Sequence, residues 1–165
     1  QYESARKNFK FIGPSPIDFD YKIAKDVCVC KELCNFNLQE YYNAKPRIDK
    51  IGIIFNLDKH DMRGSHWIAV RISRSRLEIF DPLGFQILNW PRIPCHLLNF
   101  LRRWSNHRET LITPIIQSQN SVLCGFFCIA FIICRQVIAF KKFLKLLKTP
   151  KQNDSLLLNV FSYCI

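Results

Sequence analysis

An apolar run, Gly125–Ile133, constrains the fold of this 165-residue chain more than any other feature. It follows a polar segment, residues 117–121, and predicts a buried helix over Ser121–Phe140. The apolar stretch of this helix, Val122–Cys134, is too short to span a bilayer. Cys124 stands where the polar segment enters this helix. A thiol there meets unpaired N–H groups and the positive end of the helix dipole, which favour the thiolate. Cys124 is therefore a candidate nucleophile, with an inert core cysteine as the alternative.

Two predicted strands precede this cysteine. Alternating aromatic and β-branched residues predict one strand over His66–Ile72, and a second strand, Arg76–Phe80, ends at Asp81. Adjacent strands can bring His66 and Asp81 close together, and a carboxylate on one imidazole nitrogen fixes the tautomer and stabilises the cation. The order His66, Asp81, Cys124 thus supplies a base, its orienting acid and a nucleophile. A surface role for His66 and a turn role for Asp81, which precedes Pro and Gly, are the alternatives.

Three sequence strings resemble a known family: GSHW at 64–67, FDPLGF at 80–85 and QSQNSVLCGFFC at 117–128. They closely resemble the adenovirus maturation protease family, adenain, and related proteases of other DNA viruses. FIGP at 11–14 looks like that family's N-terminal segment, and the resemblance ends near residue 135. It implies a viral cysteine endopeptidase that cleaves virion structural precursors at glycine-containing sites after an aliphatic residue.

The resemblance also implies residue roles. His66 matches the family's general base, Asp81 the acid that orients it, and Cys124 the nucleophile. Gln117 falls where the family keeps an oxyanion-hole glutamine. A side-chain amide N–H and the Cys124 backbone N–H can together hold the oxyanion of a tetrahedral intermediate. Gln119 is the competing candidate, and no metal or small-molecule cofactor is expected.

Activators are a further implication of the resemblance, because adenovirus proteases use viral DNA and a short viral peptide as cofactors. In those enzymes the peptide forms a disulfide with a cysteine eleven residues before the oxyanion glutamine. Here that position is Asn106. A disulfide-linked peptide is therefore not expected at this position. A noncovalent peptide and a disulfide to Cys95 after a local shift in alignment are the open alternatives.

The net charge of +11 is concentrated in residues 61–165, which hold fourteen Lys and Arg against five Asp and Glu. Three basic segments contribute: Arg71–Arg76, Leu101–Trp104 and Lys141–Lys148. Such a field favours a polyanionic partner, so sequence-independent, salt-dependent DNA binding is predicted. The alternative is a solvated basic face. Ala139–Lys148 also fits an amphipathic helix, which we expect to cover the protein's own core rather than a membrane.

The cysteines indicate a reducing intracellular compartment, and the resemblance places the protein in the host nucleus and the virion. A catalytic thiol with two neighbours on its own helix would be at risk of mispairing in a secretory lumen. Cys28, Cys30 and Cys34 fit no common zinc spacing and are expected to be free thiols.

The composition, 48% hydrophobic and 13% aromatic, indicates a single cysteine protease domain over residues 1–165. Irregular structure and short helices are expected up to residue 49. Four further elements and a break complete the prediction: strands at Lys50–Asn56 and Leu111–Ile116, helices at Pro94–Trp104 and Ser155–Tyr163, and a break at Thr149–Asn153. The fold class is α+β, with a mixed sheet packed on a central helix that carries the nucleophile.

Two rival functions compete with this interpretation. Proteases that remove ubiquitin-like modifiers share the His, Asp, Gln, Cys order and also cut after glycine. Their strings usually keep Asp-Ser after the second strand and Asp directly before Cys, whereas this chain has Asp81-Pro82 and Leu123. The difference favours the viral branch. A nonenzymatic basic module that binds nucleic acid would leave the complete catalytic set as a coincidence.

Overall fold

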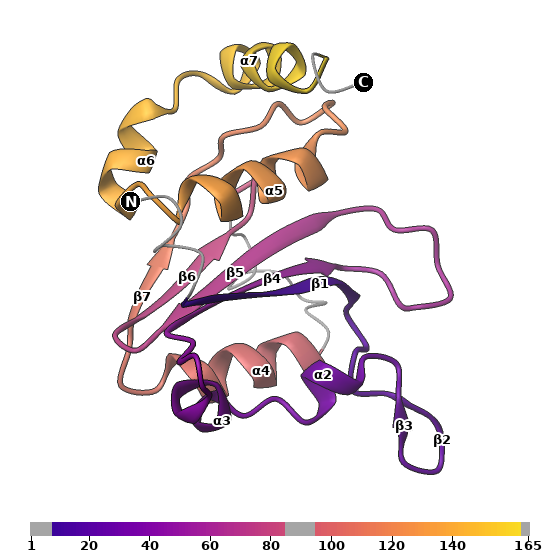
Figure 1. The fold of residues 1–165 in the computed structure, drawn as a ribbon. Helices are drawn as coiled ribbons and strands as arrows, with labels where there is room; N and C mark the ends of the chain where they lie inside the picture. The colour runs from indigo at the N-terminus through magenta and orange to yellow at the C-terminus, as the bar shows by residue number, and fades with distance from the viewer. Residues whose placement is uncertain (1–7, 85–94, 163–165) are drawn as a thin grey trace.

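The computed structural model describes residues 8–84 and 95–162. A five-stranded sheet of order β1-β4-β5-β6-β7 lies between two layers of helices (Figure 1). Its strands are β1 (Phe9–Pro16), β4 (Lys50–Asn56), β5 (Trp67–Ser73), β6 (Arg76–Phe80) and β7 (Glu109–Ile112). The two edge pairs, β1 with β4 and β6 with β7, are parallel, and the two central pairs are antiparallel. A small hairpin, β2 (Lys22–Ala24) and β3 (Val27–Cys28), lies outside this sheet.

In the described residues, helices cover both faces of the sheet (Figure 1). One layer contains α2 (Lys31–Cys34), α3 (Leu38–Asn43) and α4 (Cys95–Ser105), and the other contains α5 (Cys124–Cys134), α6 (Phe140–Leu146) and α7 (Pro150–Ser162). The mixed sheet packed on a central helix confirms the predicted α+β class. None of the helices in the described ranges is long and apolar enough to cross a bilayer.

Alternation along the central strands separates two hydrophobic cores, because successive side chains of a strand point to opposite faces. On one face Ile53 and Val70 join the core under α4. On the other face Ala69 and Phe80 pack against α5, and the rings of Phe80 and Phe131 stack with centroids 4.4 Å apart. Since both faces are covered, the buried positions of the central strands are mostly apolar, with Arg71 and Glu78 as charged exceptions.

The predicted strands at Lys50–Asn56 and Arg76–Phe80 match β4 and β6 in full. The prediction for β1 was wrong, because this segment was expected to be irregular. Its Gly13, Pro14 and Pro16 read as strand breakers. At a sheet edge, however, Pro needs no ladder partner, and a register irregularity between Ile12 and Pro14 accommodates the bend.

The prediction of one long helix over Ser121–Phe140 was also wrong, because α5 covers only Cys124–Cys134 of this stretch and α6 begins at Phe140. Helix α5 begins only at Cys124, after a turn in which Ser121 N–H bonds to the Ser118 carbonyl. It ends at Cys134, after which the N–H groups of Gln136 and Val137 bond three residues back and tighten the chain. Neither Gly nor Pro marks this second boundary in the sequence.

The predicted break at Thr149–Asn153 instead contains the start of α7. Pro150 is its first residue, where a missing N–H costs nothing and a fixed φ suits the helix. The Gln152 side chain accepts bonds from the Thr149 N–H and hydroxyl at 3.3 and 2.9 Å, in the manner of a capping box.

The prediction of free thiols was wrong for Cys28 and Cys34, which form a disulfide. Cys28 ends β3 and Cys34 ends the short helix α2, so the fold brings their Cα atoms to 6.2 Å, within the range that a disulfide bridges. Cys30, Cys95, Cys124, Cys128 and Cys134 are free.

Candidate active site

Cys124 is the first residue of α5, and this position follows from the chain around it. Leu123 has no polar side chain to cap the helix, and the intrahelical ladder starts with the bond from Phe127 N–H to the Leu123 carbonyl. The N–H groups of the first turn therefore have no intrahelical acceptor. The Cys124 thiol lies beside them at the positive end of the helix dipole.

His66 immediately precedes β5, and its backbone is fixed by a bond from Leu57 N–H to its carbonyl at 2.8 Å. Its Nε2 atom lies 2.8 Å from Oδ1 of Asp81, which directly follows β6. The proximity expected from two adjacent strands is therefore confirmed. Because Nε2 faces Asp81, Nδ1 is the imidazole nitrogen left for the thiol.

Asp81 is fixed by hydrogen bonds with three residues, His66, Thr113 and Leu83. Its N–H donates to Thr113 Oγ1 at 3.1 Å, and its Oδ1 atom also accepts from Leu83 N–H at 2.9 Å. The second bond is the local turn expected when Asp precedes Pro and Gly, and Gly84 completes that turn at φ +83°. Asp81 is thus both a turn residue and the partner of His66. The sequence offered these roles as alternatives.

The electrostatics of the site favour an ion pair between Cys124 and His66. Burial alone would raise the thiol pKa, but hydrogen bonds from His66 and from the N–H groups of Trp67 and Gly125 lower the pKa of Cys124. Burial alone would lower the imidazole pKa, but the contacts with Asp81 and Cys124 raise the pKa of His66 to about 9. The thiolate and the imidazolium therefore stabilise each other near neutral pH.

Cys128, one turn further along α5, shows the contrast. It is fully buried, and burial together with the nearby Cys124 and Asp81 charges raises its pKa well above the usual value. Its thiol bonds to the Trp67 carbonyl at 3.3 Å. Two cysteines four residues apart thus differ in reactivity, because only Cys124 faces a base.

Gln117 lies on the loop that faces the nucleophile. It is almost fully buried, and its Nε2 atom donates to the Ser121 carbonyl at 2.6 Å, which leaves one N–H of the amide for another acceptor. Its backbone N–H bonds to the Pro82 carbonyl at 2.9 Å. Gln119 also lines the cavity but is exposed and lacks such fixation among the described contacts. Gln117 is therefore the better-ordered donor.

Asn153 of α7 holds this loop in place, a role that no motif in the sequence indicates. Its amide donates to the Ile116 carbonyl at 3.0 Å and to the Lys148 carbonyl at 3.1 Å. Asp154 accepts from Ser118 N–H at 3.3 Å. Residues more than thirty positions apart thus fix both neighbours of Gln117.

Replacing Gln117 by Ala is expected to lower kcat about 10²–10³-fold with little change in KM, because an oxyanion donor acts mainly in the transition state. Steady-state kinetics on a peptide substrate measure the effect, and Gln119→Ala is the matched control. A larger loss in the Gln119 variant than in the Gln117 variant would reverse the assignment.

Two neighbouring cavities lie at and beside the nucleophile. One, of about 560 Å³, is lined by residues including His66, Gln117 and Cys124. The other, of about 590 Å³, lies between β1 and α5 and is apolar. Its lining consists of Phe9, Phe11, Pro14, Ile54, Trp67, Gly125, Ile129, Ile132 and Ile133. Trp67, Gly125 and Ile129 line both cavities, so an extended chain at the nucleophile can reach apolar walls.

The predicted basic segments differ in how much of their charge is free. In the first segment Arg71 pairs with Glu78, Arg74 with Asp49 and Arg76 with Glu109. By contrast, the lysines of and around α6 are exposed, and no ion pair is described for them in residues 95–162: Lys141, Lys142, Lys145 and Lys148. The rest of α6 confirms the predicted amphipathic helix, because Phe140 and Phe143 pack into the protein core.

Other predicted positions lie apart from this site. Cys95 is exposed at the start of α4, and Asn106 lies in the turn after that helix. Within the described ranges no group of three or more His, Cys, Asp or Glu side chains is arranged to hold a metal ion.

Comparison with known proteins connects this geometry to a protease fold. Over 85 residues, half of this chain, the sequence is 39% identical to the "Putative thiol protease R355" of Acanthamoeba polyphaga mimivirus. The chain is similar in structure to the ASFV pS273R protease, with a TM-score of 0.63 at 16% identity. The chain has the fold of a viral cysteine protease. A selenomethionine crystal structure of that protease gives a TM-score of 0.51 at 18% identity.

These matches cover only part of each related protein. The chain spans about a quarter of the mimivirus protein, 26% of its length. The two structural matches cover 92% and 94% of this chain but 59% and 61% of the ASFV protease chains. No protein-family model matches the chain. Together, the thiol protease relative and the shared fold support a cysteine peptidase.

Proposed function

We propose that the chain is a viral cysteine endopeptidase of the adenain-like type that cleaves virion structural precursor proteins during maturation. The observation that carries the proposal is the alignment of Cys124, His66 and Asp81, with an Nε2–Oδ1 distance of 2.8 Å and a thiol that faces the imidazole. The thiol protease relative and the protease fold add support.

In the proposed mechanism the Cys124 thiolate attacks the scissile carbonyl carbon and forms a tetrahedral oxyanion. The Cys124 backbone N–H and the free N–H of the Gln117 amide donate to that oxygen. The His66 imidazolium then gives its proton to the leaving amine, which leaves a thioester on Cys124. Neutral His66 next takes a proton from water, whose oxygen attacks the thioester and releases the acid. Asp81 keeps His66 oriented and stabilises its cation.

The proposed substrate is a peptide with an aliphatic residue near a glycine-containing cleavage site. The apolar cavity between β1 and α5 supports the aliphatic preference, because it shares Trp67, Gly125 and Ile129 with the nucleophile's cavity. Burying an aliphatic side chain in such a cavity contributes about 1.5–3 kcal/mol.

Activation by DNA and by a noncovalent viral peptide also belongs to the proposal. The exposed lysines of α6 support phosphate contacts, whereas the arginines of β5 and β6 are largely neutralised by acidic partners. The proposed location is the nucleus of the host cell and the virion. The Cys28–Cys34 disulfide fits a virion better than a reducing cytosol.

The proposal is tested by incubating the protein with a glycine-aldehyde peptide that carries an upstream leucine, and in parallel with a ubiquitin-like C-terminal probe. Both reactions are run with and without DNA and at low and high salt. We expect covalent capture of the peptide aldehyde at Cys124, with any DNA stimulation lost at high salt. Failure of both reagents to label Cys124 under every condition would contradict protease function.

Selective capture by the ubiquitin-like probe would instead favour a deconjugating protease. Replacing the upstream leucine by lysine in the peptide is the matched control for the apolar cavity. Equal capture of the two peptides would rule out the proposed aliphatic preference. DNA stimulation that is insensitive to salt would remove the argument from phosphate contacts.

A further inference from the structure

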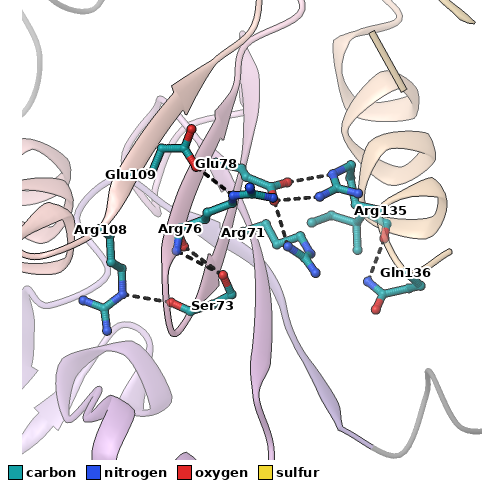
Figure 2. A network of polar contacts seen from close by, with 9 residues as sticks. Arg71, Ser73, Arg76, Glu78, Arg108, Glu109, Arg135 and Gln136 are labelled. Atoms are coloured by element: carbon teal, nitrogen blue, oxygen red, sulfur yellow. Dashed lines mark hydrogen bonds and ion pairs between the residues drawn. The ribbon is translucent and has the colours of Figure 1, made fainter. Parts of the chain in front are cut away.

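A buried ion network joins the sheet to the far end of α5 (Figure 2). Glu78 is fully buried between two arginines, Arg71 and Arg135, each about 95% buried. Its Oε1 atom accepts from Arg71 Nη1 at 2.8 Å and from Arg135 Nη2 at 2.7 Å, while its Oε2 atom accepts from Arg135 Nε at 2.7 Å. Arg135 thus binds both carboxylate oxygens of Glu78, through two nitrogens of its guanidinium. We call these three residues the charged clamp.

Each member of the charged clamp lies on or directly after a strand or helix that has one member of the Cys-His-Asp set at its end. Arg71 is on β5, which His66 precedes, and Glu78 is on β6, which Asp81 follows. Arg135 caps the end of α5, which Cys124 begins. Arg71 and Glu78 are direct cross-strand partners, so the clamp is one rung of the sheet plus one helix end.

The spacing on the two sides matches. His66 and Arg71 are five positions apart, about 17 Å along a strand. Cys124 and Arg135 are eleven positions apart, about 16 Å along a helix. The strand and the helix therefore run side by side from the catalytic set to the charged clamp, so a shift of α5 at one end is transmitted to the other.

Helix α5 needs such an anchor because its packing on the sheet is apolar apart from the weak bond from the Cys128 thiol to the Trp67 carbonyl. Its sequence, CGFFCIAFIIC, contains no charged or amide side chain. Apolar packing is non-directional, so it tolerates rotation or sliding of a helix better than bidentate ion pairs do. The nucleophile, in contrast, must sit within hydrogen-bonding distance of His66.

Stability alone gives little reason for this network. It buries two cations against one anion, and Arg71 Nε lacks a hydrogen-bond partner in the described part of the chain. Replacing such a buried triad with apolar residues is often neutral or stabilising. A gain in positional accuracy is the physical reason that fits.

We propose that the charged clamp is a positioning device, which fixes the register of α5 on β5 and β6 and thereby holds the Cys124 thiol against His66. Arg71, Glu78 and Arg135 touch no substrate in this role and act only through the placement of α5. The proposal deepens the proposed protease function, although its test does not require proteolysis.

The test compares the pH dependence of Cys124 alkylation by iodoacetamide, quantified by peptide mass spectrometry so that other thiols do not contribute. The main variant replaces the triad at once, Arg71→Met, Glu78→Leu and Arg135→Met. We expect a thermal midpoint at or above that of the wild type. At pH 6 we expect alkylation of Cys124 to slow at least about tenfold, the change for one unit of thiol pKa. If Cys124 in a stable triple variant were alkylated at pH 6 as fast as in the wild type, the proposal would be overturned.

A second variant, Arg135→Lys, keeps the charge and removes the bidentate geometry. It is expected to slow alkylation at pH 6 several-fold while it keeps the fold, so the proposal stays testable if the triple variant does not fold. An unchanged profile in this variant would also overturn it. The matched control is Glu109→Gln, which breaks the exposed Arg76–Glu109 pair (Figure 2) and should leave the profile unchanged.

The two proposals fail in different ways. A wild-type protein that resists both the peptide aldehyde and the ubiquitin-like probe, but whose low-pH alkylation depends on the charged clamp, would contradict the protease function and support the clamp. Suppose instead that the wild-type protein reacts with the peptide aldehyde, and that Cys124 is alkylated at the same rate in the wild type and in every clamp variant. This result would support the protease function and contradict the clamp.

Discussion

Replacing Cys124 by Ala is expected to lower kcat/KM about 10⁵–10⁶-fold while the protein still binds substrate peptide. The reason is that the covalent step is lost, whereas the cavity and the oxyanion donors remain. Cys124 is 6% exposed and begins a helix in which Ala is well tolerated, so the fold should be retained. Residual hydrolysis and peptide binding, measured on one preparation, separate the two effects.

Cys95→Ala is the matched control for this experiment. Cys95 also begins a helix and carries a free thiol, but it is exposed at the start of α4, in the layer on the other side of the sheet. The Cys95→Ala protein should retain wild-type activity with and without an added viral peptide. A Cys124→Ala protein that cleaves at more than about one hundredth of the wild-type rate would refute the nucleophile assignment.

Replacing Asp81 by Asn is expected to lower kcat/KM about 10²–10⁴-fold and to move its alkaline limb to lower pH. The wild-type ion pair exists above the lowered pKa of Cys124 and below the pKa of His66, about 9. Activity should therefore rise with pH through the first value and fall near the second. Without the Asp81 charge the His66 pKa drops toward its usual value, so the active window narrows from its alkaline side.

The same substitution should change the pH dependence of stability. A histidine whose pKa is raised in the folded state contributes stability that is fully present below its unfolded pKa, about 6.5, and is lost as pH rises through the folded value, about 9. Thermal midpoints of the Asp81→Asn protein should therefore differ from wild type more at pH 6 than at pH 9.5.

Asp18→Asn is a matched control because Asp18 and His60 form a second carboxylate–imidazole pair, 2.7 Å between Oδ2 and Nδ1, outside the catalytic cavity. This variant should keep the wild-type pH–activity profile. An alkaline limb that is identical in the wild-type and Asp81→Asn proteins would show that Asp81 does not control His66.

Local sequence patterns predicted the strands whose apolar residues lie in the protein core. The strands Lys50–Asn56 and Arg76–Phe80 follow from short apolar and β-branched runs between polar turns. The start of α7 was also encoded locally, in Thr149-Pro150 and Gln152, but was interpreted as a break. The edge strand β1 was hidden by its prolines, which become acceptable only once β4 lies on one side and no described strand on the other.

The sequence by itself determined the identity and order of the candidate set, His66, Asp81, Gln117 and Cys124, because the strings around them resemble those of a known family. Tertiary structure alone decided the state of these groups. It placed Asp81 against Nε2 of His66 and the Cys124 thiol at the first turn of α5, so that their pKa values move together. It also supplied the charged clamp and the Asn153 contacts, whose members are dispersed along the chain. Hydrogen bonds and ion pairs act over a few ångströms, and only folding brings such distant residues within that range.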